Sequence, residues 1–205
     1  MIIAVDGPAA SGKGTIARAL ASHYGLPYLD TGLLYRAVAV ALKRAGGNPD
    51  DADDALKAAA FPDDLLNDPE LRLEESGALA SRVSAHPGVR AALLARQRTF
   101  AQQPGGAVLD GRDIGTVIVP DADAKLYVTA SAQVRAERRA KEMESRGLKA
   151  DRDAMQAEIE ARDARDMGRD SAPLMQASDA ALLDSSDLTI EQALAQAIAL
   201  VEAQV

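Results

Sequence analysis

The sequence predicts an α/β fold in which a mostly parallel β-sheet is flanked by helices. Strand-like and helix-like segments alternate along the chain, a pattern typical of βαβ units. A glycine-rich segment at residues 7–15 separates the first strand-like run from the first helix-like run. With 205 residues, the chain is long enough for one such domain carrying a small insertion.

The expected strands are short apolar runs, and the expected helices repeat apolar residues at three- and four-residue spacing. Strands are expected at residues 2–5, 26–29, 107–109, 124–128 and 181–183. Helices are expected at residues 13–24, 33–44, 51–60, 74–85, 89–103, 132–146 and 152–169, with a last helix opened by Thr189. Ser131 is expected to cap the helix after it, and Thr189 with Gln192 forms a capping-box pattern.

The composition excludes several classes of function. The formal net charge is -8, whereas nucleic acids and anionic membranes both require a positive protein surface. Aromatic residues make up 3% of the chain, so stacking platforms for single-stranded nucleic acid are not expected. The chain has no cysteine and only two histidines, which removes disulfides, thiolate sites and most histidine-based metal sites.

The chain shows no run that predicts export or assembly. The opening apolar run at residues 2–5 is too short for a signal peptide or a membrane helix, and no later run is long enough to span a membrane. We therefore expect a cytoplasmic protein. Because no long exposed apolar stripe is evident, we also expect a monomer.

The segment with phosphate-binding character is Gly7-Pro8-Ala9-Ala10-Ser11-Gly12-Lys13-Gly14-Thr15, which has the spacing of a P-loop between a strand and a helix. Its glycines let successive backbone N–H groups turn toward phosphate oxygens, and the helix start adds a positive partial charge. Lys13 then bridges the outer phosphates. The alternative is a glycine-rich turn with an incidental lysine. However, a cation is unfavourable in a first helical turn, and Gly14 costs about 1 kcal/mol there relative to alanine. A bound anion offsets the first cost, so we expect this segment to bind ATP.

The residues after Lys13 indicate which type of P-loop protein this is. Gly14 stands where most P-loops have the Ser or Thr that binds magnesium, and Thr15 follows one position later. Gly-Lys-Gly-Thr is the form that nucleoside monophosphate kinases use, so the expected cofactor is Mg2+ carried by ATP, with Thr15 as a ligand. Asp110 ends the apolar run at residues 107–109, as a Walker B-like acid does. We expect it to orient magnesium-bound water; alternatively, it only caps the strand end.

Four further segments matter together with the P-loop. They are Asp30-Thr31-Gly32-Leu33-Leu34-Tyr35-Arg36, Val89-Arg90, Asp110-Gly111-Arg112-Asp113-Ile114-Gly115-Thr116, and the run from Arg162 to Leu174. In order, and over nearly the whole chain, the set closely resembles bacterial cytidylate kinases. The resemblance implies a P-loop NTPase-type sheet and transfer of the γ-phosphoryl group of ATP to CMP or dCMP.

The resemblance also implies which residues surround the acceptor nucleotide: Thr31, Arg36, Ser81, Arg90, Arg112 and Asp113. Three of them, Ser81, Arg90 and Asp113, resemble a cytosine-reading set. The amino group of cytosine would donate to Asp113 or Ser81, and uracil would leave those groups unpaired. Taken alone, Arg36 could be a solvated helix charge, Thr31 could cap its helix, and Arg112 with Asp113 could be a surface ion pair.

Two arginine-rich helices, at about residues 132–170, are expected to form a lid. Each is expected to gather three arginines on one face: Arg135, Arg138 and Arg139, and then Arg162, Arg165 and Arg169. The simpler interpretation is a pair of solvated helices with acidic partners. With a P-loop upstream, a lid that neutralises the charge moving between two phosphates is favoured. The resemblance implies catalytic roles for Arg162, Asp166 and Arg169 beside Lys13, and a weaker one for Arg138 at ATP.

The domain organisation follows from these assignments. Residues 1–205 are expected to form a single P-loop kinase domain, with an acceptor-binding insertion at about 31–105. Between Phe61 and Arg72 the chain is shorter than the enzymes it resembles, because the strands of a small β-rich insertion are missing. We expect this loss to affect how firmly the acceptor part closes.

Two other classes of function fit parts of the pattern. A P-loop kinase acting on a hydroxyl, such as that of shikimate, would need a carboxylate base, for which Asp30 or Asp113 is available. A nucleotide-dependent switch would hydrolyse ATP slowly and would leave the lid arginines unexplained. UMP or AMP is a further possible acceptor, because the choice of CMP rests on the resemblance alone.

Overall fold

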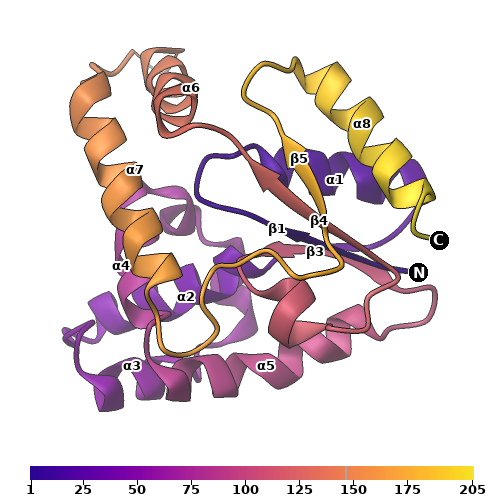
Figure 1. The fold of residues 1–205 in the computed structure, drawn as a ribbon. Helices are drawn as coiled ribbons and strands as arrows, with labels where there is room; N and C mark the ends of the chain where they lie inside the picture. Colours follow the sequence, from indigo (N-terminus) through magenta and orange to yellow (C-terminus); the bar gives the residue numbers. More distant parts are fainter. Residues whose placement is uncertain (146) are drawn as a thin grey trace. The chain divides into compact units, whose positions relative to one another are not determined.

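The chain forms two compact units in the computed structural model, which describes residues 1–145 and 147–205 (Figure 1). Unit 1 comprises Met1–Leu29 and Gln103–Val205, and unit 2 comprises Asp30–Gln102. Unit 2 is therefore inserted in the sequence at the end of the second strand. Among the described residues, no helix is both long and apolar enough to cross a membrane.

Unit 1 is built on a five-stranded sheet with the order β2-β3-β1-β4-β5. The strands are β1 (Ile2–Asp6), β2 (Tyr28–Asp30), β3 (Ala107–Gly111), β4 (Ala124–Thr129) and β5 (Ala181–Asp184). β1 pairs in parallel with β3 and β4, and β4 pairs in parallel with β5. The expected α/β fold with a parallel sheet is confirmed. β1 and β3 are buried along almost their whole length, which explains why both are continuous apolar runs.

Two helices cover one face of this sheet, α1 (Lys13–Tyr24) and α8 (Ile190–Glu202) (Figure 1). Leu20 of α1 and Val201 of α8 pack in one core with Val5 and Leu126 of the sheet. The predicted capping box is confirmed, because the Thr189 side chain accepts from the Gln192 N–H and the Gln192 side chain accepts from the Thr189 N–H. This box fixes where α8 begins.

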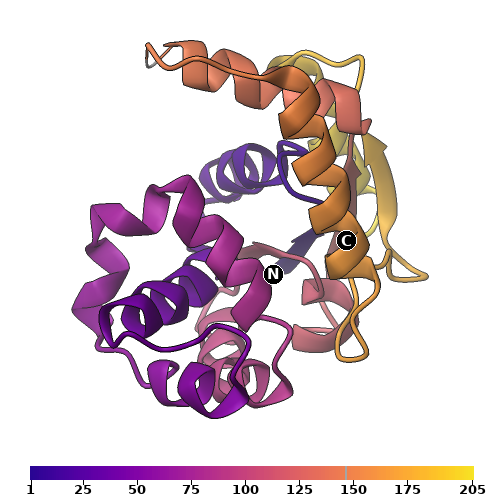
Figure 2. The same cartoon turned by 90° about the vertical axis from the view of Figure 1, so that its left-hand side faces the viewer.

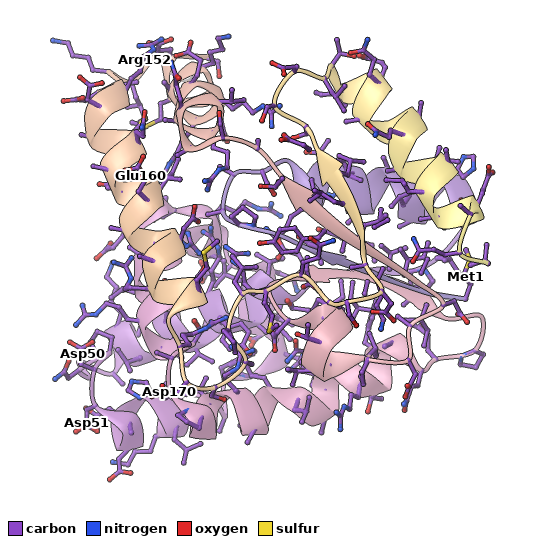
Figure 3. All side chains as sticks on the ribbon, viewed as in Figure 1. Met1, Asp50, Asp51, Arg152, Glu160 and Asp170 are labelled. Atoms are coloured by element: carbon purple, nitrogen blue, oxygen red, sulfur yellow. The ribbon has the colours of Figure 1, made fainter. Side chains whose placement is uncertain are left out.

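The other two helices of unit 1, α6 (Ala132–Ser145) and α7 (Arg152–Met167), pack against each other and run in clearly different directions (Figure 2). Ser131 caps α6 as expected, since its Oγ accepts from the Val134 N–H at 3.2 Å. Arg152 at the start of α7 reaches back to Glu137 at 2.7 Å and Glu144 at 2.9 Å on α6 (Figure 3). The predicted end of the first of these helices, Arg146, lies outside the described residues.

Unit 2 is helical, with α2 (Thr31–Arg44), α3 (Ala52–Ala58), α4 (Glu74–Val83) and α5 (Pro87–Ala101). The short stretch before α4 contains two 3₁₀ turns, Asp63–Asn67 and Pro69–Arg72. Asp51 caps α3 through bonds from two backbone N–H groups, and the neighbouring Asp50 pairs with Arg82 of α4 (Figure 3). These acidic residues therefore have local structural roles.

Several predicted boundaries are wrong by a few residues, each for a local reason. The second strand begins at Tyr28 because Gly25 ends α1 in a left-handed conformation and the Leu26 N–H bonds back to the Ala21 carbonyl. α5 begins at Pro87, because proline suits the first helical position. The sequence did not predict the π-helical turn Ile114–Ile118 that follows β3.

Candidate functional site

The P-loop backbone is shaped by two glycines and one strained alanine. A Cβ on Gly7 would lie 2.0 Å from the Val128 carbonyl oxygen, so only glycine fits there. Gly12, which precedes α1, has φ 86°, and Ala10 has φ 60°. A non-glycine residue in the left-handed region is uncommon, and such strain gathers at binding loops. The loop conformation is thus strongly specified by its surroundings.

The predicted lysine and acid of the phosphate site lie together. Lys13 Nζ is 3.8 Å from Asp110 Oδ2, and Asp110 is buried at the end of β3. Tyr28 of β2 donates a hydrogen bond from its hydroxyl to Asp110 Oδ1 at 2.8 Å. A Cβ on Gly14 would make only ordinary contacts with Asp110 and Tyr28, at 3.5 and 3.6 Å. Thr15 is exposed in the first turn of α1.

The partnership of Tyr28 with Asp110 was missed by sequence reasoning. Its signal is weak, because it requires knowing that β2 and β3 are neighbours in the sheet. Once that order is known, a tyrosine and an aspartate at the same edge are expected to meet.

Two α6 arginines bind carbonyl groups of the P-loop. Arg135 Nη1 donates to the Ala9 carbonyl at 3.2 Å, and Arg138 Nη1 donates to the Ser11 carbonyl at 3.5 Å. Arg138 also bonds Ser185, whose Oγ donates to the Ser11 carbonyl at 3.1 Å. The P-loop backbone is thus held by α6 and by the end of β5.

The α6 arginines also have acidic partners on α7. Arg135 pairs with Asp163 at 2.7 Å, and both side chains are largely buried. Arg139 lies 3.9 Å from Glu158. The positive charges of the α6 arginines are therefore partly compensated by acidic residues of α7. This agrees with the simpler interpretation, in which the two helices carry acidic partners for their arginines. The buried pair nevertheless links α7 to the residue that holds the P-loop.

A second cluster forms around Asp166 near the end of α7. Arg112 Nε donates to Asp166 Oδ2 at 2.9 Å, and Arg162 Nε is 4.0 Å from the same oxygen. Burial raises the pKa of Asp166, but the charges of Arg112, Arg162 and Arg169 outweigh it and leave the pKa below its ordinary value. Asp166 is therefore a carboxylate at neutral pH.

One expectation about this cluster is wrong. Arg162, Arg165 and Arg169 do not share a helix face, because α7 ends at Met167 with Gly168 as its C-cap. Arg169 lies beyond the helix and donates to the Ala172 carbonyl at 2.9 Å. The alternative interpretation of Arg112 and Asp113 as a surface ion pair is excluded, since Asp113 is buried.

Asp6, at the end of β1, is a buried acid that the sequence analysis did not single out. Its Oδ1 accepts from the Ile114 N–H and its Oδ2 accepts from the Gly115 N–H, each at 2.8 Å. The pKa of Asp6 is raised to about 7, chiefly by burial and to a smaller extent by the charge of Asp113, while the two hydrogen bonds and Lys13 oppose the rise. The available signal was an acid at the end of an otherwise apolar strand, directly before Gly7.

Unit 2 holds four of the six predicted acceptor residues. Arg36 is not a solvated helix charge, because its Nη1 donates to the carbonyls of Leu71 and Leu73 at 2.8 and 3.1 Å. Thr31 is buried as the first residue of α2, and the N-cap is Asp30, so the alternative interpretation of Thr31 as a helix cap is excluded.

The other two, Ser81 on α4 and Arg90 on α5, are joined through Ser84. Arg90 Nη1 donates to the Ser84 carbonyl at 3.3 Å, and Ser84 Oγ donates to the Ser81 carbonyl at 3.0 Å. The Arg90 guanidinium also lies 5.4 Å from the centre of the Tyr35 ring, a cation–π contact. The remaining predicted acceptor residues, Arg112 and Asp113, belong to unit 1.

Comparison with known proteins decides the family. The family model for cytidylate kinase matches residues 3–203. The chain belongs to the cytidylate kinase family. Cytidylate kinase of Xanthobacter autotrophicus is 59% identical over the whole chain and 98% of the relative, and that of Bradyrhizobium sp. is 58% identical over 99% of the chain and 96% of the relative. The resemblance seen in the sequence is confirmed, and the comparisons give no support to the hydroxyl-kinase or switch alternatives.

A solved structure supports the fold alone. An uncharacterized protein from Eubacterium ventriosum aligns with a TM-score of 0.57 at 15% identity, covering 99% of each chain. The two cytidylate kinase relatives also bear on the short stretch between Phe61 and Arg72. Because the chain covers 98% and 96% of them, little of either cytidylate kinase is left to hold an additional insertion.

Proposed function

We propose that the chain transfers the γ-phosphoryl group of ATP to a phosphate oxygen of CMP or dCMP, giving ADP and CDP or dCDP. The observation that carries the proposal is the P-loop with its Lys13–Asp110 pair, in a chain that matches the cytidylate kinase family over residues 3–203. The acceptor phosphate is anionic near neutral pH, so the reaction needs positioning and charge neutralisation more than a strong base.

The donor nucleotide is assigned to the P-loop. The backbone N–H groups of residues 7–15 and the N-terminus of α1 would bind its phosphates, and Lys13 would bridge the outer ones. Arg138 would contact ATP from α6, close to the Ser11 carbonyl that it already binds. The buried Ser11 hydroxyl, which has no partner within the described part of the chain, faces this loop as a further donor.

Magnesium suits the oxygen donors at this place. Thr15 Oγ1 and the carboxylate of Asp110 are hard ligands of the kind that Mg2+ prefers, with Asp110 acting through water. Asp110 lies next to Gly14, since a Cβ there would be 3.5 Å from Asp110 Oδ2, so the proposed acid is beside the P-loop. Bound magnesium would neutralise charge on the β- and γ-phosphates.

The arginines are assigned to the two phosphate groups that exchange the phosphoryl unit. Arg162 and Arg169 would neutralise the charge that develops during transfer. Asp166 would act through Arg112, whose Nε it binds at 2.9 Å. It would thereby position a residue that contacts the acceptor nucleotide. For the acceptor we assign Thr31, Arg36, Ser81, Arg90, Arg112 and Asp113. Of these, Ser81, Arg90 and Asp113 would read the base.

The test is the initial rate of ADP formation from Mg·ATP with CMP, dCMP, UMP, AMP or shikimate, beside a control without acceptor. We expect fast turnover with CMP and dCMP and poor turnover with UMP. Lys13→Met should lower kcat by about 100-fold or more, whereas Lys141→Met, on the exposed side of α6, should not change it. Turnover with AMP or shikimate instead, or slow hydrolysis that no acceptor accelerates, would contradict the proposal.

A further inference from the structure

We infer that Asp6 is a positioning residue for acceptor recognition: its carboxylate holds the loop that carries Arg112 and Asp113. The inference rests on the proposed function, because it concerns the acceptor of that reaction. Asp6 is not part of the phosphate-binding segment itself, although it directly precedes Gly7.

The first observation is that both carboxylate oxygens of Asp6 are used on one loop. Oδ1 accepts from Ile114 and Oδ2 from Gly115, each at 2.8 Å, and these residues directly follow Asp113. The bonds join residues that are 108 and 109 positions apart in the chain. Above its pKa of about 7, Asp6 is a carboxylate, and a carboxylate that accepts two backbone N–H groups makes charge-assisted bonds, which are stronger than neutral ones.

The second observation is the geometry of the loop that these bonds fix. The N–H groups of Ile114 and Gly115 belong to the first residues of the π-helical turn, and such leading N–H groups have no partner inside their own turn. The turn closes on Asp113 itself, whose carbonyl accepts from Val117 and Ile118. Asp6 and the turn thus fix the backbone at the Asp113 carbonyl and at the two residues that follow it.

The third observation is that burial, strand pairing and close contacts restrict the position of the Asp6 side chain. It is 5% exposed and pairs in register with Gly111 of β3, the residue before Arg112. A Cβ on Gly115 would come within 3.1 Å of Lys125 Cδ and 3.5 Å of Asp6 Oδ2, so the loop lies close against this carboxylate. Loss of either bond is therefore expected to move the backbone that follows Asp113.

The sharpest variant is Asp6→Asn, which keeps the volume but leaves one oxygen to accept two bonds. We expect the KM for CMP to rise about tenfold and the KM for ATP to change less than about twofold. The preference for CMP over UMP, measured as a ratio of kcat/KM, should fall at the same time. Asp6→Glu keeps both oxygens on a longer arm and should raise the KM for CMP by a smaller factor.

The matched control is Asp123→Asn. The Asp123 Oδ2 also accepts a backbone bond, from Ile2 at 2.7 Å, but at the opposite end of β1. This variant should leave both KM values and the CMP preference unchanged. If Asp6→Asn proves too unstable to assay, Asp6→Glu carries the test by the same criterion.

The outcomes separate the inference from the function on which it rests. An unchanged KM for CMP, or an equal rise in both KM values, would overturn the positioning role. Absence of CMP turnover in the unmodified protein would instead contradict the proposed function.

Discussion

Gly77 on α4 shows how one missing side chain can serve a site. A Cβ at Gly77 would lie 2.9 Å from Arg36 Nη2, so the guanidinium that bonds the Leu71 and Leu73 carbonyls would have to move. Alanine in place of glycine normally stabilises a helix by about 1 kcal/mol. In Gly77→Ala this gain is offset by the lost Arg36 hydrogen bonds, so we expect the stability to stay almost unchanged. The KM for CMP should rise about fivefold, because Arg36 is displaced from its carbonyl partners.

Steady-state kinetics and thermal unfolding of the same samples check this prediction. Ala78→Gly, at the neighbouring exposed position, is the control: it should cost about 1 kcal/mol of stability and leave the KM for CMP as it was. If Gly77→Ala binds CMP normally, Arg36 is not held in place by the space over Gly77.

The raised pKa of Asp6 also predicts how the stability of the folded chain changes with pH. Its pKa is raised from 3.8 to about 7 in the folded chain, chiefly by burial, and the groups that face it are Asp113, Lys13 and Tyr127. Between pH 3.8 and about pH 7, Asp6 therefore keeps its proton in the folded state and has lost it in the unfolded state. The Asp6 contribution to stability is full below pH 3.8 and is lost as pH rises toward 7, by at most about 1.4 kcal/mol per pH unit.

Urea unfolding of the protein and of Asp6→Asn, from pH 5 to pH 8 without nucleotide, measures this contribution. The stability advantage of the unmodified protein over Asp6→Asn should shrink as pH rises to about 7 and then stay constant. Paired acids such as Asp166 have lowered pKa values and contribute the opposite slope only at more acidic pH. A difference that is flat across this range would show that Asp6 is already ionised throughout.

At the same scale, the motif residues were predictable and their partners were not. Lys13 and Asp110 were found because both belong to segments with a recognisable order of residues. Asp6 and Tyr28 escaped because their roles depend on bonds across neighbouring strands. A single sequence does not state which strands are neighbours.

The contact between α6, α7 and the P-loop depends on one arginine. Arg135 donates to the carbonyls of Ala9 and Ala130 and pairs with Asp163, so it joins three parts of unit 1. Lysine has a single nitrogen and cannot reproduce these directions. We expect Arg135→Lys to lower stability by about 3 kcal/mol, because Asp163 is left buried with an incomplete partner, and to lower kcat about tenfold.

Chemical unfolding and turnover rates measure both effects. Arg152→Lys is the control, because Arg152 pairs with Glu137 and Glu144 at an exposed position and should change stability by no more than about 0.5 kcal/mol. Equal effects of the two substitutions would mean that α6 is held by its apolar contacts alone.

The element boundaries show which local signals are reliable. Side-chain caps were predicted correctly at Ser131 and Thr189, because the capping pattern lies within four residues. The end of α7 was placed two residues too late, which put Arg169 on a helix that it does not join. Gly168 is the local signal for that end, because glycine commonly follows the last residue of a helix.

At the scale of the whole molecule, the fold was predictable and its sheet order was not. Alternating strands and helices with a P-loop after the first strand predict a parallel sheet, which is confirmed. Apolar periodicity carries no information about the strand order β2-β3-β1-β4-β5. The expected insertion at about 31–105 and the observed unit Asp30–Gln102 nearly coincide, but acceptor binding by that unit stays a prediction.

The two units allow the two substrate assignments to be tested apart. The predicted ATP residues all belong to unit 1, whereas the predicted acceptor residues are divided, with Arg36 and Arg90 in unit 2 and Arg112 in unit 1.

A ligand slows amide hydrogen exchange where it suppresses local opening. Mg²⁺ with a non-hydrolysable ATP analogue should therefore protect residues 7–15, and CMP alone should protect segments of both units. Lys13→Met should remove the first protection and keep the second, because its lost charge belongs to the donor side. Protection by CMP that is confined to one unit would contradict the acceptor assignment, and protection by the analogue that survives in Lys13→Met would contradict the role of Lys13.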